Sequence, residues 1–276
     1  LFWFLHLGFL ASSQTAPNCG MLPEYSSNNT FSNVTVNTVT TRTGQHIKIS
    51  GTVNFNANVN FFNCTILMEE GAVVNINNAH FNLWANANGP SLIFGCNKMW
   101  QAININANSS VSFRGSTIRN GRQGLTINPG FNNLNSEIVD CIFDGNSAAI
   151  TATNVPNFTF TTFSGNHLLG TTIKPLMKPH LPNEPIFGMY LRNCVGTIGT
   201  SGAANRFTNF SQAFRAIGGT YTINNCSFEN NNLLDWEGFG TGIGIWVYNA
   251  NLTIDNIFSN GASCQFIGNR RALRFD

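Results

Sequence analysis

The chain has 276 residues and a formal net charge of +2, and charged residues make up only 9% of it, compared with about 25% in an ordinary soluble domain. Lysine and arginine do not cluster into the basic surface that nucleic acid requires, so no nucleic-acid partner is predicted. Polarity comes instead from 43 asparagines, together with many threonines and serines. Because asparagine tolerates left-handed backbone and bonds to its neighbours, this composition predicts many turns.

Residues 1–14 resemble the end of a secretory signal peptide. Residues 1–10 are apolar, and small or polar residues follow at 11–14, which is the order found before a cleavage site. The apolar run is too short to span a bilayer comfortably, so we expect no membrane span in the mature chain. The protein is therefore predicted to be secreted or exposed at the cell surface. The chain stops within a repeat, at residues 272–276, so we expect further domains of the same longer protein.

Residues 15–46 are predicted to form an N-terminal cap and the first strands, and residues 47–276 a single repetitive body. Between residues 30 and 63, polar and apolar residues alternate, as in Val53-Asn-Phe55 and Val59-Asn-Phe61. A period of two is typical of short, half-buried strands. No segment sustains the 3.6-residue period of a helix, so we expect essentially no helix.

An apolar anchor followed by a short strand recurs through the C-terminal two-thirds of the chain. The clearest copy has Phe143 as its anchor, Asn146 three residues later, and a small–apolar–x–apolar strand at residues 149–152. The short steps between anchors are 143 − 118 = 25, 163 − 143 = 20 and 228 − 207 = 21 residues. A turn of about 20–25 residues lies in the range of solenoid proteins. The predicted anchors are Ile118, Phe143, Phe163, Phe207, Phe228 and Phe266.

Three short strands per turn, stacked in parallel with about 4.8 Å between turns, predict an all-β parallel β-helix. The recurring phenylalanines would fill its interior. Charged residues would be rare because like residues stack on like residues in successive turns, and a column of charges would repel itself. One corner of the helix is predicted to carry a ladder of stacked amides. The members of this ladder would be Asn146, Asn166, Asn231 and Asn269.

Seven cysteines are compatible with an exported protein, although their number is odd. Cys141, Cys226 and Cys264 each precede an anchor by two residues, so they are predicted to occupy one buried column of the repeat. The pattern leaves the pairing of any disulfide open.

The anchors followed by asparagine and the small–apolar–x–apolar strands resemble those of the pectin-lyase-like right-handed β-helix superfamily. The segment Cys96-Asn-Lys-Met-Trp-Gln-Ala-Ile103 resembles part of large exported β-helical surface proteins of bacteria. This resemblance covers residues 96–276 well and residues 30–95 loosely. It implies a right-handed parallel β-helix, with a sorting domain beyond residue 276. It implies little about function, because lyases, hydrolases, adhesins and tailspikes share this fold.

Two insertions interrupt the repeat at the same corner, at residues 168–187 and 232–241. Both fall between the asparagine ladder and the same strand, so the two loops should project from one edge about 10 Å apart. The first contains His180 and four prolines, and the second contains Asp235, Trp236 and Glu237 beside glycines.

The strand that borders these loops is predicted to present one outward residue in each turn. Tyr190, Arg215 and Arg274 from this row, with His180, Asp235 and Trp236 from the loops, form the predicted ligand-binding site. Such groups suit a polysaccharide or cell-surface glycan, through ring stacking and hydrogen bonds to hydroxyls. The alternative is that both loops are tolerated surface insertions, with Trp236 packed over the end of a turn. The predicted row is Asn104, Thr126, Thr151, Tyr190, Arg215, Gly244 and Arg274.

The sequence therefore predicts a non-catalytic exported scaffold of the adhesin type, and the alternative is a polysaccharide lyase or glycoside hydrolase. Polysaccharide lyases and hydrolases with this type of fold carry carboxylates on outward strand positions. The outward row predicted for this chain has none. Asp235 and Glu237 are a weak candidate for a catalytic pair. Asp140 and Asp144, near Arg119 and Arg122, are predicted to belong to a surface salt-bridge patch on adjacent turns. No metal-ligand spacing or cofactor motif occurs, so neither a metal nor a cofactor is expected.

Five threonines between residues 35 and 43 are compatible with a flat threonine array of the kind that binds ice. Their spacing is irregular and threonine favours strands, so β propensity is the better account of them. These residues are Thr35, Thr38, Thr40, Thr41 and Thr43.

Overall fold

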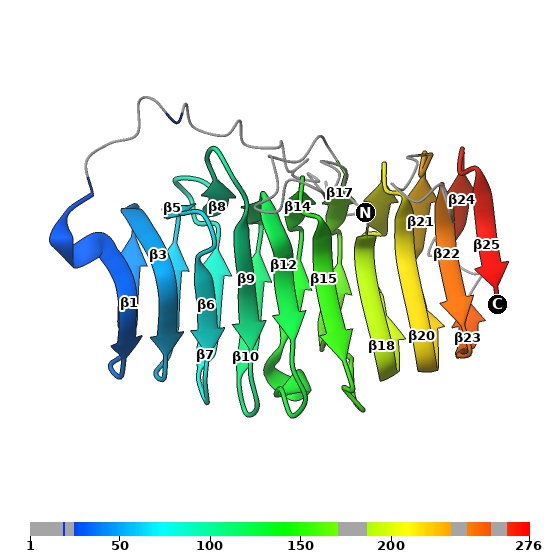
Figure 1. The fold of residues 1–276 in the computed structure, drawn as a ribbon, viewed down its shortest axis with the longest axis horizontal. Helices are drawn as coiled ribbons and strands as arrows, with labels where there is room; N and C mark the ends of the chain where they lie inside the picture. The colour runs from blue at the N-terminus through cyan, green and yellow to red at the C-terminus, as the bar shows by residue number, and fades with distance from the viewer. Residues whose placement is uncertain (1–18, 20–24, 171–186, 233–241, 255–263) are drawn as a thin grey trace, which may run out of the picture.

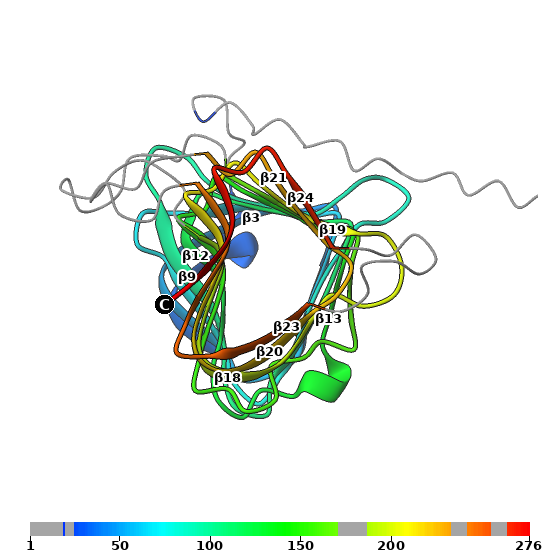
Figure 2. The same ribbon diagram turned by 90° about the vertical axis from the view of Figure 1, so that its right-hand side faces the viewer.

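The computed structural model of the protein describes residues 19, 25–170, 187–232, 242–254 and 264–276. The described part of the chain is all-β, with very little helix beyond the short 3-10 turns η2 (Ser27–Asn29) and η3 (Asn133–Asn135). A 19-stranded parallel sheet curls about 325° around a long axis, and a 6-stranded sheet lies beside it. Figure 2 shows the strands viewed along this axis, arranged around a common interior.

The strands stack in three columns. In most turns the chain passes through a strand of the first column, then one of the second, and then one of the third. The first column contains β5 (Thr65–Met68), β8 (Leu92–Gly95), β11 (Thr117–Arg119), β14 (Ile142–Asp144), β17 (His167–Leu169), β19 (Asn205–Thr208), β21 (Cys226–Glu229) and β24 (Gln265–Ile267). The second contains β6 (Val73–Ile76), β9 (Trp100–Ile105), β12 (Gly121–Ile127), β15 (Ala148–Thr153), β22 (Ile243–Tyr248) and β25 (Arg271–Phe275). The third contains β2 (Thr40–Thr43), β4 (Val59–Phe62), β7 (His80–Trp84), β10 (Ser110–Arg114), β13 (Glu137–Val139), β16 (Thr162–Ser164) and β23 (Asn251–Ile254).

Four longer strands run through two columns each. β1 (Thr30–Val36) and β3 (His46–Phe55) pass from the first column to the second, and β18 (Phe187–Ile198) and β20 (Gln212–Ile223) pass from the second to the third. The backbone N–H of Thr200 donates to the carbonyl of Phe163 over 3.0 Å, so the third column continues past β16. Figure 1 shows the second column side by side across the molecule, from β1 to β25.

The first column defines the repeat, and it corrects one predicted anchor. Its central buried side chains include Ile118, Phe143, Leu168, Phe207 and Phe228, which pair in register from turn to turn. The first two steps are 143 − 118 = 25 and 168 − 143 = 25 residues. The prediction that Phe163 is an anchor is wrong, because Phe163 pairs with Ile138 in the third column.

Buried asparagines stabilise two corners of the coiled chain, where a single ladder was predicted. Asn166 precedes the first column, and its Nδ2 donates to Oδ1 of Asn205 in the next turn over 2.9 Å. Asn231 and Asn269 follow the first column, and Nδ2 of Asn231 donates to Oδ1 of Asn269 over 2.8 Å. Asn146 lies at this second corner, where its Oδ1 accepts from the backbone of Gly121 over 2.8 Å. The prediction is therefore wrong for Asn166.

The predicted column of buried cysteines is confirmed. Cys141, Cys226 and Cys264 each stand directly before or at the start of a first-column strand, and all three are buried and not disulfide-bonded. Cys64 occupies the same position before β5. These small apolar side chains fill the corner where the chain enters the first column.

Asparagine also builds the outer turns, as the composition predicted. Among the described residues, eleven asparagines adopt positive φ, for example Asn63 at 50° and Asn120 at 61°. Asp140 does the same at 52°. Asparagine enters this left-handed region at low cost, so a chain that turns between each pair of strands uses it often.

Candidate functional site

The two predicted insertions attach at one edge of the second column. The first leaves after β17 and rejoins at β18, and the second leaves after β21 and rejoins at β22; β19 and β20 form the turn between them. In each case the chain leaves the first column and returns to the second. The predicted site residues His180, Asp235, Trp236 and Glu237 lie outside the described residues.

The outward row of the second column is as predicted except at one position. Thr151, Tyr190 and Arg215 pair in register, and Trp246, not Gly244, pairs with Arg215 on one side and Arg274 on the other. The pattern small–apolar–x–apolar fits residues 242–245 and residues 244–247 equally well. The second fit is the correct one, because Ile245 takes the buried position beside Phe214. Considering both fits of the pattern would have identified Trp246 as a candidate outward residue.

Tyr190, Arg215, Trp246 and Arg274 form a row in which aromatic rings and guanidinium groups alternate, which we call the cation–π row. The guanidinium carbon of Arg215 lies 4.3 Å from the ring centroid of Trp246, and that of Arg274 lies 4.3 Å from the same centroid. Arg215 also lies 5.9 Å from the ring of Tyr190. Because the two arginines come from the strands on either side of β22, they cover opposite faces of the indole.

Further polar groups hold the cation–π row in place. Nη1 of Arg215 donates to Oε1 of Gln212 over 3.5 Å. Asp276 accepts from Nε1 of Trp246 over 2.9 Å and lies 2.8 Å from Nε of Arg274. The strands β18, β20, β22 and β25 contain no carboxylate, while Arg192 and Arg271 add exposed positive charge. This end of the outer surface therefore carries more positive than negative charge.

The carboxylates that the structure describes on the first column are engaged in ion pairs. Oδ2 of Asp144 lies 2.7 Å from Nη2 of Arg119, and Oε2 of Glu229 lies 2.6 Å from Nη2 of Arg206. The predicted salt bridge between Asp144 and Arg119 is confirmed, but its predicted surface location is wrong, because the Asp144 side chain is only 3% exposed. The Arg206 hydrogen bond lowers the pKa of Glu229. Glu229 is thus held as a carboxylate, the form that cannot donate a proton to a leaving group.

His167 stands next to this cluster, and we expect it to make stability depend on pH. Burial, followed by the charge of Arg206, lowers the pKa of His167 below its ordinary value of 6.5. The unfolded chain therefore takes up this proton first, so stability is fully present above pH 6.5 and declines as the pH falls toward the folded pKa. Melting temperatures between pH 7.5 and 5.5 should show this decline. His167→Gln should remove it, and an unchanged slope in that variant would contradict the assignment.

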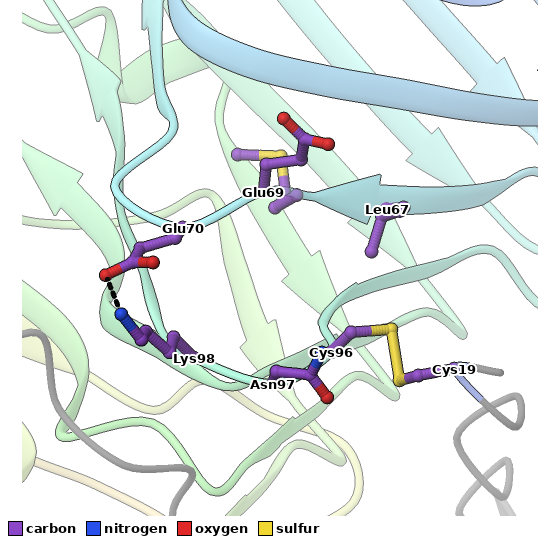
Figure 3. A pocket seen from close by; sticks show the side chains of 8 residues that line it. Cys19, Leu67, Glu69, Glu70, Cys96, Asn97 and Lys98 are labelled. Carbon is purple, nitrogen blue, oxygen red and sulfur yellow. Dashed lines mark hydrogen bonds and ion pairs between the residues drawn. A yellow bond between two sulfur atoms is a disulfide. The ribbon is translucent and has the colours of Figure 1, made fainter.

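A second candidate site is a hollow of about 530 Å³ beside a disulfide between Cys19 and Cys96. Figure 3 shows this disulfide together with the ion pair between Lys98 and Glu70, whose atoms are 2.8 Å apart. Glu69, which also lines the hollow, pairs with Lys48 at 2.6 Å. Since lysines neutralise both acids, the hollow offers no unpaired charge that would orient a ligand. Cysteine spacing alone could not have identified this disulfide.

Among the described residues there is no group of three or more His, Cys, Asp or Glu side chains that could hold a metal ion. In the same part of the chain, none of the helices is long and apolar enough to cross a membrane. Comparisons with protein-family models, with curated proteins and with solved structures returned no match to this chain.

Proposed function

We propose that this chain is an exported, non-catalytic surface scaffold that binds acidic polysaccharide along the outer surface of its second column. We further propose that the solenoid is a right-handed parallel β-helix of the pectin-lyase-like type. The parallel pairing of strands in successive turns and the nearly closed curl of the large sheet support this assignment.

The observation that carries the proposal is the cation–π row. Guanidinium groups form paired, charge-assisted hydrogen bonds with carboxylates. Both faces of the Trp246 ring are covered by arginines, so a sugar ring would not stack on this indole. Binding would instead use N–H groups of Arg215 and Arg274, with ring edges supplying apolar contact. These two arginines are two turns apart, or about 10 Å, so an extended polymer with recurring acid groups suits the row better than a single small anion.

The disulfide supports export. Cys19 and Cys96 are joined, and structural disulfides persist mainly in oxidising compartments outside the cytosol. A chain that is exported and carries a polymer-binding face would act at the cell surface, as an adhesin or as part of an extracellular matrix.

A polysaccharide lyase or glycoside hydrolase is the second candidate. Hydrolysis of this kind uses two carboxyl groups that flank the scissile bond. Within the described residues, the strands beside the cation–π row supply no carboxylate, and Asp276 is bonded to Trp246 and Arg274. Asp235 and Glu237 remain the predicted pair for this alternative, and release of reducing ends or of unsaturated products from a polyuronate would favour it.

Binding to alginate, a polyuronate, tests the proposal. We expect Arg215→Gln and Arg274→Gln each to weaken binding about tenfold, or about 1.4 kcal/mol, in isothermal titration. Added salt should weaken alginate binding by the wild-type protein. Arg114→Gln is the control, because Arg114 also lies near an indole, 5.6 Å from the ring centroid of Trp84, but on the third column. Equal loss in the control, or equal affinity for neutral dextran, would refute the proposal.

A further inference from the structure

The N-terminal half of the second column carries an outer surface of a different chemistry. Where β3, β6 and β9 end, the last two outward positions of each turn are asparagines, arranged as the pairs Asn54 and Asn56, Asn75 and Asn77, and Asn104 and Asn106, with the second member of each pair just after the strand. The residue between the two asparagines of each pair points inward and is buried. Phe55 and Ile76, for example, are 1% and 0% exposed. We call these six asparagines the amide array.

Hydrogen bonds along the axis fix each side chain of the amide array. Nδ2 of Asn75 donates to Oδ1 of Asn54 over 2.8 Å, and Nδ2 of Asn104 donates to Oδ1 of Asn75 over 2.8 Å. The second row repeats this arrangement, with Asn77 donating to Asn56 over 3.0 Å and Asn106 donating to Asn77 over 2.6 Å. All four bonds run in the same direction. Every amide in a row therefore has the same orientation.

The rows extend beyond the amide array with side chains of the same kind. At one end, Asn56 donates to Asn37 over 2.9 Å. At the other, Asn128 donates to Asn106 over 2.7 Å, and the hydroxyls of Thr126 and Thr151 lie 3.1 Å apart. The surface thus continues from β1 to β15 without a charged group in either row.

Each amide still has hydrogen-bonding capacity that faces solvent. An asparagine side chain has two N–H donors and two acceptor lone pairs, and the ladder of an interior member such as Asn75 or Asn77 uses one of each. The remaining donors and acceptors form a lattice. Its spacing is about 4.8 Å along the axis and about 6.6 Å along the strand, across two residues. Figure 1 shows β1, β3, β6, β9 and β12 side by side on this broad face.

We propose that the amide array binds ice. A regular lattice of fixed donors and acceptors orders water at the same intervals, and hexagonal ice repeats its surface oxygens at comparable spacings. Because the ladder already holds the side chains, little conformational entropy is lost on contact with the crystal. A soluble sugar chain is a poorer fit, since the rows of the array offer neither an aromatic ring nor a charge.

The inference differs from the threonine array considered for residues 35–43. Thr41 belongs to a separate ladder on the third column, where Asn60 donates to it over 3.1 Å. Thr35 alone of those threonines lies in a row of the amide array, where Asn54 donates to it over 3.5 Å. The repeated element is therefore Asn–apolar–Asn. The proposal is independent of polysaccharide binding at the cation–π row, which lies on the other half of the column.

Partition into slowly grown ice tests the proposal on the complete chain. We expect the wild-type protein to be enriched in the ice and to inhibit ice recrystallisation. The double variant Asn56→Lys with Asn77→Lys places two long cations on the array and should lower the effect about tenfold. The matched control is Asn60→Lys with Asn82→Lys, because Asn82 donates to Asn60 over 2.7 Å in the same type of ladder on the third column. The control should retain the wild-type effect, and both variants should show wild-type circular dichroism.

Three results would overturn the inference. Exclusion of the wild-type protein from ice, to the same degree as serum albumin, would by itself overturn the inference, without any variant. An equal loss in the control would show that the amide array has no special role. Array-dependent binding to cellulose without partition into ice would assign the surface to a neutral polysaccharide instead.

Discussion

Phe228→Ala is expected to lower the free energy of unfolding by about 4 kcal/mol. Phe228 is fully buried in the first column, with its ring centroid 4.9 Å from that of Phe207 and 5.3 Å from that of Phe266. The substitution removes apolar surface from the core, leaves a cavity, and breaks two stacked ring pairs at once. Urea denaturation followed by fluorescence should show a lower midpoint with a similar slope, because the area exposed on unfolding changes little.

Phe228→Leu is the control for this prediction. Leucine keeps most of the side-chain volume and loses the ring contacts, so its loss should be clearly smaller than that of alanine. If Phe228→Ala cost less than about 1 kcal/mol, the site would be able to collapse around the missing ring. The continuous phenylalanine interior from β19 to β24 would then be refuted.

Reduction of the Cys19–Cys96 disulfide is expected to cost about 4 kcal/mol, since the two cysteines are 77 residues apart and long loops lose the most entropy on closure. The bond also holds Cys19 against an apolar cluster on the outer surface of the first column, formed by Leu67, Leu92 and Phe94, against which Tyr25 packs as well. Melting temperatures with and without a phosphine reductant would measure this effect.

Cys19→Ser provides the matched control, because it should reproduce the destabilisation and make the protein insensitive to the reductant. The other five cysteines are buried and not disulfide-bonded, so the reductant has no second disulfide among the described residues to act on. A wild-type melting temperature that is unchanged by the reductant would contradict a stabilising role of this bond.

The all-β, parallel arrangement could be predicted from sequence because each turn of the sheet repeats the constraints of the last. Alternating residues set the strands, and the position of Cys141 two residues before Phe143 recurs at Cys226 and Cys264. Prediction failed where two positions satisfied the same pattern. Both Phe163 and Leu168 are buried apolar residues, and Phe163 is followed by Asn166 at the expected distance, although the structure places Leu168 in the anchor row. Only the register of neighbouring turns distinguishes them.

The candidate site, too, could be predicted from sequence only in part. Tyr190, Arg215 and Arg274 were predicted to share an outward row, and they do. Trp246 was missed because the glycine-rich entry to β22 allows two registers that differ by two residues, and burial of Ile245 beside Phe214 decides between them. A two-residue shift keeps the same face of the strand outward, so alternation alone could not detect the error.

Hydrogen–deuterium exchange in the presence of alginate tests the central claim most directly, namely that the cation–π row on the second column is the binding surface. We predict that protection will increase in β18, β20, β22 and β25, while the third-column strands β7, β10 and β13 are unaffected. The same experiment with Arg215→Gln should show weaker protection at the same strands. Protection confined to the third column, or no protection at saturating alginate, would contradict the claim.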